Sequence, residues 1–279
     1  MKNILNEMQL KAVKMIDNPV VVCAGAGSGK TRVIAHRVAY IVTDLSYDSS
    51  SILCVTFTNK AAREMKERIS SLLVSCQIQP LVTTFHGFSL YLIRRYGCEI
   101  GIDSYSVIDE SDQKEILKKI IKAFGCDEKE FAPKKVLSYL SIKESNSSLE
   151  SDMQSNYKLA IYEKILHEYQ LEKKKSKLLD FDDLLKAAVK LLKNEKVSSI
   201  VQNRFFHVLV DEYQDTSIIQ HELIKLLVKN KDGEYIASSF CVVGDEDQSI
   251  YSWRGAHVYN MTHFKKDFPS SETIMLTRN

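Results

Sequence analysis

A glycine-rich segment near the beginning of the chain has the residue types and the spacing of a phosphate-binding loop. Residues 24–31 read AGAGSGKT and directly follow the apolar run Val20–Cys23. Glycine lets successive backbone N–H groups point at one oxyanion, and a helix that follows the loop adds its positive end. Lys30 could then reach the β- and γ-phosphates of a nucleotide, and the hydroxyl of Thr31 could be a ligand of Mg²⁺. The position between a strand and a helix favours this interpretation over an ordinary glycine-rich turn.

Two acidic residues at the end of a later apolar run could complete a site for phosphate hydrolysis. Asp211 and Glu212 directly follow Phe205–Val210, which reads as a strand. Asp211 has the length to hold Mg²⁺ through water next to Thr31, and Glu212 could orient and deprotonate the attacking water. An isolated Asp-Glu pair would be a polar loop after a strand, but the phosphate loop in the same chain favours the catalytic interpretation.

A third predicted strand is followed by a neutral amide, which would lie at the same edge of the sheet. The apolar run Phe240–Val243 is followed by residues 244–248, which read GDEDQ. From there, the side chain of Gln248 could reach a γ-phosphate oxygen or the attacking water. Because that hydrogen bond would disappear on hydrolysis, Gln248 would act as a switch.

Aromatic and basic side chains follow several of the predicted strands and helices on the nucleotide side of the sheet. They are Phe57, His86, Tyr251 and Trp253, the single tryptophan, with Lys60 and Arg254 nearby. Aromatic faces beside basic groups suit base stacking with phosphate contact, at about 1–3 kcal/mol per stacked base. The alternative is that Phe57 and Tyr251 belong to the core, whereas the polar, glycine-containing sequence around Trp253 argues against burial there. The pattern predicts a path for a single strand of nucleic acid.

Short apolar runs alternate with helical patterns over the first hundred residues and again after about residue 205. The predicted strands are Val20–Cys23, Ile52–Thr56, Leu81–Thr84, Phe205–Val210, Phe240–Val243 and Thr273–Leu276. Predicted helices follow the first three strands, at about Lys30–Val42, Asn59–Leu73 and Gly87–Tyr96, and a further helix precedes the first strand. Continuous apolar strands, each followed by a helix, indicate an α/β fold with a parallel sheet that is covered on both faces.

Between these two parts, at about 100–195, amphipathic segments rich in lysine and glutamate replace the strands. Asp112–Phe124 and Tyr157–Tyr169 are examples, and no convincing β run occurs there. This amphipathic pattern without strands predicts an inserted helical subdomain. The run Glu172–Lys177, which reads EKKKSK, is most simply a solvated helix end, with contact to a nucleic-acid backbone as the alternative.

Length and composition are typical of a globular protein with a proper core. The 279 residues suffice for one large or two modest domains, and the net charge of +2 means that a polyanion would need a local basic patch. No apolar run approaches the roughly 20 residues of a membrane span, and no signal peptide is evident. Among the six cysteines, Cys23, Cys54 and Cys241 lie in apolar runs, so we expect buried, reduced thiols in a cytoplasmic protein without a membrane partner.

Taken together, the motifs resemble those of superfamily 1A DNA helicases of the UvrD, PcrA and Rep kind. The matching segments are Leu5-Asn6 with Gln9 (Q motif), 24–31 (motif I), 55–62 (motif Ia), 84–87 (motif Ib), 179–185 (the end of a helical insertion), 210–216 (motif II) and 243–256 (motif III). They run almost from end to end of the chain and in the family's order. Collinear matches of this number are more diagnostic than the phosphate loop alone.

The resemblance implies a role for each matching residue. Gln9 would recognise adenine and Arg32 would pack near the base, while the phosphates would be bound by Ala24, Gly25, Ala26, Gly27, Ser28, Gly29, Lys30 and Thr31. Gln214 would couple the ATP site to the DNA site. The DNA strand would be lined by Phe57, His86, Tyr251 and Trp253, and its backbone would be held by Thr56, Asn59, Lys60 and Arg254.

The same resemblance implies the domain organisation and the activity. A RecA-like P-loop ATPase domain (1A, residues 1–95 and 200–279) would be interrupted by an all-helical domain (1B, residues 96–199). Hydrolysis of ATP with Mg²⁺ would drive 3′→5′ movement on single-stranded DNA, with single-strand/duplex junctions as substrates. Leu276–Asn279 resembles the opening of motif IV, so we expect the second RecA-like domain to lie outside this chain. We also expect the chain alone to bind Mg-nucleotide weakly and to hydrolyse it slowly.

Three other interpretations stay open at this point. One is the N-terminal motor part of a helicase–nuclease recombination subunit, whose nuclease would follow residue 279. Another is a small-molecule kinase, which would leave Phe57–Lys60 and Trp253–Gly255 unexplained. The third is a non-catalytic module that binds nucleic acid or a partner, which the presence of Lys30 and Glu212 disfavours.

Overall fold

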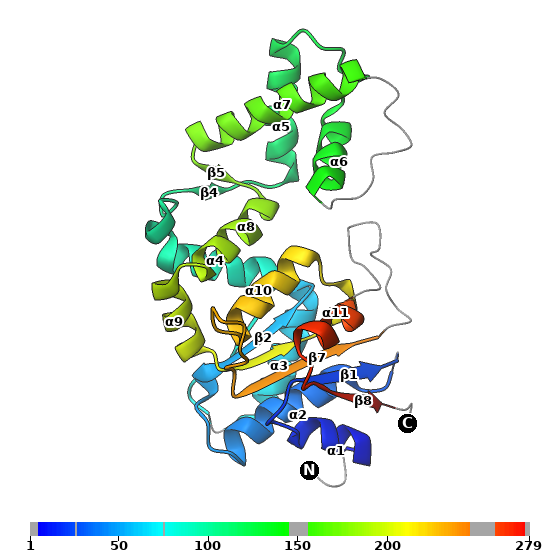
Figure 1. The fold of residues 1–279 in the computed structure, drawn as a ribbon, viewed down its shortest axis with the longest axis vertical. Coiled ribbons are helices and arrows are strands. Elements are labelled where there is room, and N and C mark those ends of the chain that lie inside the picture. Colours follow the sequence, from blue (N-terminus) through cyan, green and yellow to red (C-terminus); the bar gives the residue numbers. More distant parts are fainter. Residues whose placement is uncertain (1–4, 26, 75, 145–155, 246–259, 277–279) are drawn as a thin grey trace. The chain divides into compact units, whose positions relative to one another are not determined.

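The chain folds into strands and helices that alternate in its first and last parts, with consecutive helices between them (Figure 1). The computed structural model describes residues 5–25, 27–74, 76–144, 156–245 and 260–276. In chain order the elements, with 3₁₀ helices marked η, are α1 (Glu7–Lys14), β1 (Val20–Ala24), α2 (Lys30–Thr43), η1 (Ser49–Ser51), β2 (Ile52–Thr56), α3 (Asn59–Leu72), β3 (Leu81–Thr84), α4 (Phe85–Tyr96), η2 (Gly97–Ile100), β4 (Ser106–Val107), α5 (Glu110–Ala123), α6 (Pro133–Glu144), α7 (Asn156–Lys175), β5 (Leu178–Leu179), α8 (Phe181–Leu192), α9 (Glu195–Arg204), β6 (His207–Val210), η3 (Tyr213–Asp215), α10 (Ile218–Val228), β7 (Ser239–Gly244), α11 (Asn260–Asp267) and β8 (Glu272–Leu276).

These elements form two compact units. One unit contains residues 1–92 and 188–279, and the other contains residues 93–187. The chain passes from one unit to the other inside α4 and returns inside α8. Within the described parts of both units, no helix combines the length and the apolar composition that a membrane span requires.

A six-stranded parallel sheet forms the centre of the first unit, in the order β3-β2-β6-β7-β1-β8. Every residue of β1, β2, β6 and β7 is buried, because these strands consist almost entirely of apolar side chains and lie between two layers of helices. The sequence-based prediction of an α/β fold with a parallel sheet is confirmed. The strands bury Cys23, Cys54 and Cys241, as predicted.

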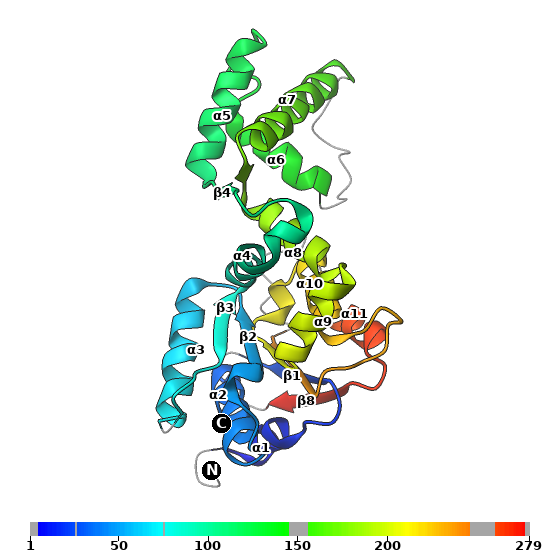
Figure 2. The same ribbon diagram turned by 90° about the vertical axis from the view of Figure 1, so that its left-hand side faces the viewer.

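Helices cover both faces of the sheet. Figure 2 shows α3 on one side of the sheet and α10 on the other. On the α3 side the buried core includes Val20 and Val22 of β1, Val33, Ile34 and Val38 of α2, and Met65 and Ile69 of α3. On the other side α10 buries Leu223, Ile224 and Leu227. Each helix therefore presents an apolar stripe to the sheet, as an amphipathic helical pattern requires.

Arg37 fixes the phosphate-loop helix α2 to its neighbours. Its side chain is fully buried, with 0% exposed surface. The guanidinium donates from Nη1 to the carbonyl oxygen of Ala12 in α1 at 2.6 Å, and from Nη2 to the hydroxyl of Ser239 at the start of β7 at 3.0 Å. Because a buried charged group is costly without such partners, these bonds hold three elements in a defined relation.

Some element boundaries differ from the predicted ones for local reasons. β6 begins at His207, because the N–H of Phe205 closes the last turn of α9. α4 begins at Phe85, where the hydroxyl of Thr84 accepts the N–H of Gly87 at 3.1 Å and satisfies the first turn. The two short strands β4 and β5 pair in parallel within the region that was predicted to contain only helices.

The second unit has its own core, which three helices build. α5, α6 and α7 bury a cluster that consists of Leu117, Ile120, Ile121, Phe131, Val136, Tyr139, Tyr162, Ile165, Leu166 and Tyr169. The ring of Tyr162 contacts both Phe131 and Tyr139, with centroids 5.2 and 5.0 Å apart. The predicted helical segments Asp112–Phe124 and Tyr157–Tyr169 lie in α5 and α7, shifted by a few residues.

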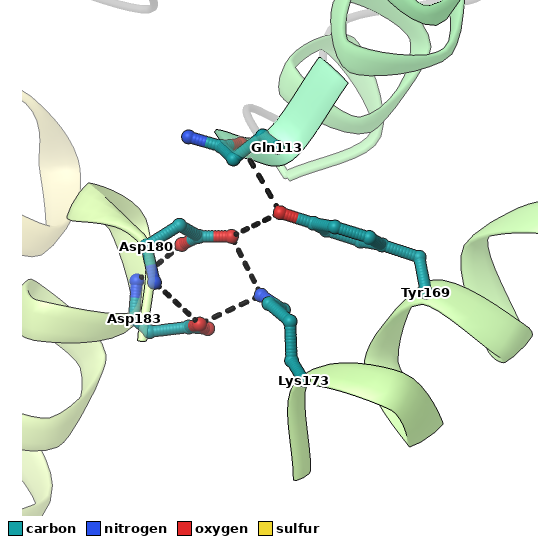
Figure 3. Close-up of polar contacts among 5 residues, drawn as sticks. All are labelled: Gln113, Tyr169, Lys173, Asp180 and Asp183. Atoms are coloured by element: carbon teal, nitrogen blue, oxygen red, sulfur yellow. Dashed lines mark hydrogen bonds and ion pairs between the residues drawn. The ribbon is translucent and has the colours of Figure 1, made fainter. Parts of the chain in front are cut away.

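The lysine-rich end of α7 is not simply solvated, so that prediction is wrong for Lys173. This side chain is only 2% exposed. Its Nζ lies 2.6 Å from Oδ2 of Asp180 and 2.6 Å from Oδ2 of Asp183 (Figure 3). The hydroxyl of Tyr169 lies 3.2 Å from the same Asp180 oxygen and 3.2 Å from Oε1 of Gln113. A run of like charges in the sequence gave no sign that one member would turn inward.

The two aspartates hold that position because they also cap α8. Asp183 donates its N–H to Oδ1 of Asp180 at 2.9 Å, and Asp180 donates its N–H to Oδ2 of Asp183 at 3.1 Å. This is a reciprocal capping box at a helix N-terminus. Burial alone would raise the pKa of Asp180, but its interactions with the Lys173 ammonium and its hydrogen bonds lower that pKa below the ordinary value. The carboxylate of Asp180 therefore depends on its contacts with Lys173, Tyr169 and Asp183.

Replacing Lys173 by methionine should destabilise the second unit. Lys173→Met leaves the buried carboxylate of Asp180 and the half-buried carboxylate of Asp183 without their cation, so we expect the free energy of unfolding to fall by on the order of 3 kcal/mol. Urea unfolding followed by circular dichroism measures this change. Lys174→Met, at the exposed neighbouring position, is the matched control and should shift stability by no more than roughly 0.5 kcal/mol. Equal unfolding midpoints for the two variants would contradict the assignment.

Candidate functional site

The glycine-rich turn between β1 and α2 adopts a conformation that other residues rarely take. Gly27 and Gly29 have φ values of 76° and 90°, and Gly29 is the N-cap of α2. Both the N–H and the hydroxyl of Ser28 donate to the carbonyl oxygen of Gly25, at 3.2 and 2.6 Å. Lys30 begins α2 directly after this turn. The backbone therefore curls at the positive end of a helix, which is the geometry of an anion site.

The side chain of Gln9, on α1, fixes the same turn by a hydrogen bond to its backbone. Its Nε2 donates to the carbonyl oxygen of Ser28 at 2.8 Å, and its Oε1 accepts the N–H of Asn6 at 3.0 Å. A Cβ at position 29 would lie 2.9 Å from that Nε2, so both the positive φ and the close approach require Gly29. Gln9 has 0% exposed surface, whereas Arg32 is exposed on α2. The contact of Gln9 with adenine stays a prediction.

The acidic residues lie at the same edge of the sheet as Lys30. β6, β7 and β1 are adjacent and parallel, so the residues that follow them meet at one edge. Nζ of Lys30 lies 3.4 Å from Oε2 of Glu212 and 3.9 Å from Oδ2 of Asp245. The N–H of Asp211 donates to the carbonyl oxygen of Val55 at 2.9 Å, which also links the end of β6 to the end of β2.

Burial and mutual repulsion of the carboxyl groups shape the protonation of this cluster. Burial, together with the neighbouring Glu212, raises the pKa of Asp211 to about 7. The same two causes raise the pKa of Asp215 to about 6. Lys30 lowers both values, but it does not compensate for the loss of water and the nearby negative charge. Such a site favours the arrival of a further cation.

Gln214 connects the acidic segments that follow β6 and β7. Its Nε2 donates to Oε2 of Glu212 at 2.8 Å, and its Oε1 accepts the N–H of Asp245 at 3.0 Å. Glu212 has a φ of 51°, a left-handed conformation that is uncommon for a residue with a side chain. A non-glycine residue in that conformation costs on the order of 1–3 kcal/mol, so the surrounding contacts must hold it there.

The donor groups suit magnesium with a bound nucleotide. Asp211 offers a buried carboxyl group, one oxygen of which accepts the N–H of Glu212 at 3.0 Å, and Thr31 offers a partly exposed hydroxyl at the start of α2. In the described part of the chain, no group of three or more His, Cys, Asp or Glu residues could hold a metal by itself. Mg²⁺ needs no such cage, because it commonly binds through one or two side chains, water and phosphate oxygens.

The residues that were predicted to contact DNA differ in accessibility. At the end of β2 and the start of α3, Thr56 is fully buried, Phe57 is half-buried, and Asn59 and Lys60 are exposed. His86 is half-buried in the first turn of α4, and burial lowers its pKa. Because Thr56 has no exposed surface, contact with a DNA backbone would require its neighbours to move.

Several predicted site residues lie outside the described part of the chain. They are Ala26 of the phosphate loop, Gln248, and the DNA-contact candidates Tyr251, Trp253 and Arg254. Their roles therefore stay predictions.

The sequence interpretation had also not singled out Asp245 as a partner of Lys30 or Asp215 as a buried acid. The order of the strands, which places the end of β7 between those of β6 and β1, was the missing information.

Comparison with known proteins identifies similar sequences. Residues 5–269 match the family model described as the UvrD/REP helicase N-terminal domain. The chain is 40% identical over 281 residues to ATP-dependent DNA helicase PcrA of Bacillus subtilis (strain 168), a match that covers 99% of the chain and 37% of the relative. ATP-dependent DNA helicase PcrA of Staphylococcus aureus (strain Mu50 / ATCC 700699) is 38% identical over 283 residues, with coverage of 99% and 38%. The chain thus spans less than two fifths of the length of these curated relatives.

The raised pKa of Asp211 predicts how the affinity for Mg²⁺-nucleotide depends on pH. Below a pH of about 7 the carboxyl group holds a proton that competes with the cation, so affinity should rise as the pH increases through that value. Calorimetric titration with ADP and Mg²⁺ between about pH 6 and about pH 8 measures this dependence. Asp211→Asn is the control, since it keeps the shape but cannot lose a proton. The difference between the two curves excludes the titration of the nucleotide itself, and parallel curves would contradict the prediction.

Proposed function

The chain belongs to the UvrD/REP helicase N-terminal domain family, as its motifs predicted, and on that premise we propose that it is the ATP-binding part of a DNA helicase. One observation carries this proposal. Lys30, at the glycine-rich turn, lies 3.4 Å from Glu212 at the end of β6. A phosphate-binding lysine beside a carboxylate at one edge of the sheet is the arrangement that hydrolysis of a nucleoside triphosphate requires.

Each group of the site has a distinct role in this proposal. The backbone N–H groups of the turn and the Lys30 ammonium bind the phosphates and hold the γ-phosphate in place. Thr31 and Asp211 would hold Mg²⁺, which would neutralise charge on the phosphate oxygens. Glu212 orients a water molecule toward the γ-phosphate and accepts its proton. Gln214, which donates to Glu212 at 2.8 Å, fixes the direction of that carboxylate.

The proposed DNA strand passes over the ends of β2 and β3. Phe57 and His86 offer partly exposed rings there, and Asn59 and Lys60 offer exposed polar groups at the start of α3. The backbone hydrogen bond from Asp211 to Val55 joins the end of β2 to the acidic residues of the nucleotide site. Stacking of bases on aromatic rings and pairing of phosphates with a lysine provide binding without sequence specificity. Tyr251, Trp253 and Arg254 complete the predicted set.

The finer features of the activity follow the family resemblance. We propose movement in the 3′→5′ direction on single-stranded DNA and action at single-strand/duplex junctions. We also propose that residues 1–95 and 200–279 form the RecA-like domain 1A and that residues 96–199 form the inserted domain 1B. Full motor activity would need a second RecA-like domain that closes on ATP, so hydrolysis by this chain alone should be slow.

Glu212→Gln should separate nucleotide binding from hydrolysis. The amide keeps the size of the side chain but cannot accept a proton, so we expect single-turnover hydrolysis of ATP to fall by roughly 100-fold or more. Affinity for Mg²⁺-nucleotide should be retained. Rapid quench with enzyme sites in excess of radiolabelled ATP measures the first quantity, and calorimetry measures the second. Glu222→Gln, on α10, is the matched control and should hydrolyse like the wild type. Undiminished hydrolysis in Glu212→Gln would exclude the proposed base.

Lys60→Met should weaken the binding of single-stranded DNA. Loss of one phosphate contact should lower affinity for oligo-dT severalfold and reduce the slope of log Kd against log salt concentration by roughly 0.7. Fluorescence anisotropy of a labelled oligonucleotide at several salt concentrations measures both effects. Lys66→Met, at another exposed position of α3, tests whether any lysine on this helix would do the same. Identical behaviour of the two variants would count against a DNA path at the start of α3.

A further inference from the structure

Tyr213 leads from the acidic end of the nucleotide site to α11. It is the first residue of η3 and directly follows Glu212, and its side chain has no exposed surface. Its ring packs edge-on against Phe264 of α11, with centroids 5.6 Å apart and ring planes at 87°. Phe264 also contacts Phe268 of the same segment at 4.8 Å and Phe240 of β7 at 5.4 Å. A continuous aromatic cluster therefore joins η3, α11 and β7.

The hydroxyl of Tyr213 begins a chain of hydrogen bonds to the end of α11. It lies 2.5 Å from Nδ1 of His221 on α10, and Nε2 of His221 lies 2.7 Å from Oδ2 of Asp267. An ionised carboxylate only accepts hydrogen bonds, so Nε2 carries the proton that faces Asp267. In the neutral ring Nδ1 is then an acceptor, and the tyrosine hydroxyl donates to it. The hydroxyl of Tyr213, the ring of His221 and the carboxylate of Asp267 therefore form one continuous series of hydrogen bonds.

Two lysines, one on α10 and one directly after it, fix the far end of this series of hydrogen bonds. Nζ of Lys225 lies 2.8 Å from Oδ1 of Asp267, and Nζ of Lys229 donates to the backbone carbonyl oxygen of Asp267. Nζ of Lys229 also lies 4.8 Å from the centroid of the Phe268 ring. Asp267 therefore receives hydrogen bonds at both carboxylate oxygens and at its main chain. Charge-assisted bonds of this kind are stronger than neutral ones and restrict the position of the acceptor.

Gln214, the residue after Tyr213, fixes a second segment of the polypeptide, at the end of β7. Gln214 accepts the N–H of Asp245, directly after β7, at 3.0 Å and donates to Glu212 at 2.8 Å. Residues 246–259, which include the predicted DNA contacts Tyr251, Trp253 and Arg254, connect Asp245 to α11 in the sequence. Gln214 therefore contacts Asp245, which precedes that connection, and Tyr213 contacts α11, which follows it.

We propose that Tyr213, His221 and Asp267 form a positioning relay that couples the nucleotide site to DNA binding. The inference rests on the proposed function, because it assumes that the chain binds both ligands. A nucleotide that changes the position of Glu212 shifts η3, and the hydrogen bonds and aromatic contacts transmit this shift to α11. Coupling between two sites is reciprocal, so a bound oligonucleotide changes the affinity for nucleotide by the same factor. None of the three residues needs to touch either ligand.

The test measures a coupling ratio on the whole chain. This ratio is the Kd for labelled oligo-dT without nucleotide, divided by the Kd in the presence of saturating Mg²⁺ and a nonhydrolysable ATP analogue. We expect the wild-type ratio to differ from one by roughly fivefold or more. Tyr213→Phe removes the hydroxyl but keeps the ring against Phe264, so the ratio should move toward one by roughly threefold, while the separate affinities change by less than roughly twofold.

Two further variants separate the relay from simple loss of stability. Asp267→Asn keeps the shape at the far end and should reduce the ratio in the same way, and the double variant should reduce it no further than either single change, because both interrupt one chain. Tyr235→Phe is the matched control. Tyr235 is half-buried, but its hydroxyl is buried and its ring lies 6.5 Å from that of Phe268. Because it lies outside the relay, this variant should keep the wild-type ratio.

The outcomes distinguish the relay from the proposed function. A reduced ratio in Tyr213→Phe and Asp267→Asn, with normal separate affinities and a normal ratio in Tyr235→Phe, supports the relay. Normal binding of both ligands with an unchanged ratio in the first two variants overturns the relay alone, as does a wild-type ratio of one. A wild-type chain that binds neither ligand overturns the proposed function and the relay together.

Discussion

The meeting of one lysine with several carboxylates at the edge of the parallel sheet is the constraint on which the rest of the molecule depends. Lys30 faces Glu212 and Asp245, while burial and repulsion raise the pKa of Asp211 to about 7. Like charges move apart unless the structure holds them together. The strand order β6-β7-β1 brings them to one edge, and the amide of Gln214 joins two of the acidic segments. The stability that the buried strands provide is in part used to maintain this unfavourable cluster.

Much of the first unit could be predicted from the sequence, because its signals are local. Continuous apolar runs such as Ile52–Thr56 predicted the strands, and the alternation with helical periods predicted the parallel sheet. The glycine spacing before Lys30 predicted a curled turn, and the positive φ values of Gly27 and Gly29 agree with it. The motifs also led to the correct family. The roles of the individual site residues stay predictions.

The features that the sequence did not reveal are pairings between distant residues. Lys173 turns inward because Asp180 and Asp183 already occupy the N-terminus of α8, and a run of lysines contains no sign of that. Similarly, His221 and Asp267 are 46 positions apart, and their contact depends on the packing of two helices. Single-sequence patterns reflect the exposure expected of a residue type, whereas these contacts arise only from the completed fold.

The strand order also has a consequence for how the protein is made. β1 is formed from residues near the N-terminus, yet its two neighbours in the sheet, β7 and β8, come from the last part of the chain. During synthesis on the ribosome, the glycine-rich turn therefore emerges long before the strands that support it. The helical unit of residues 93–187 is contiguous in sequence and can fold first. Until β7 and β8 have been synthesised, β1 exposes apolar strand edges, which makes the nascent chain a natural client for chaperones.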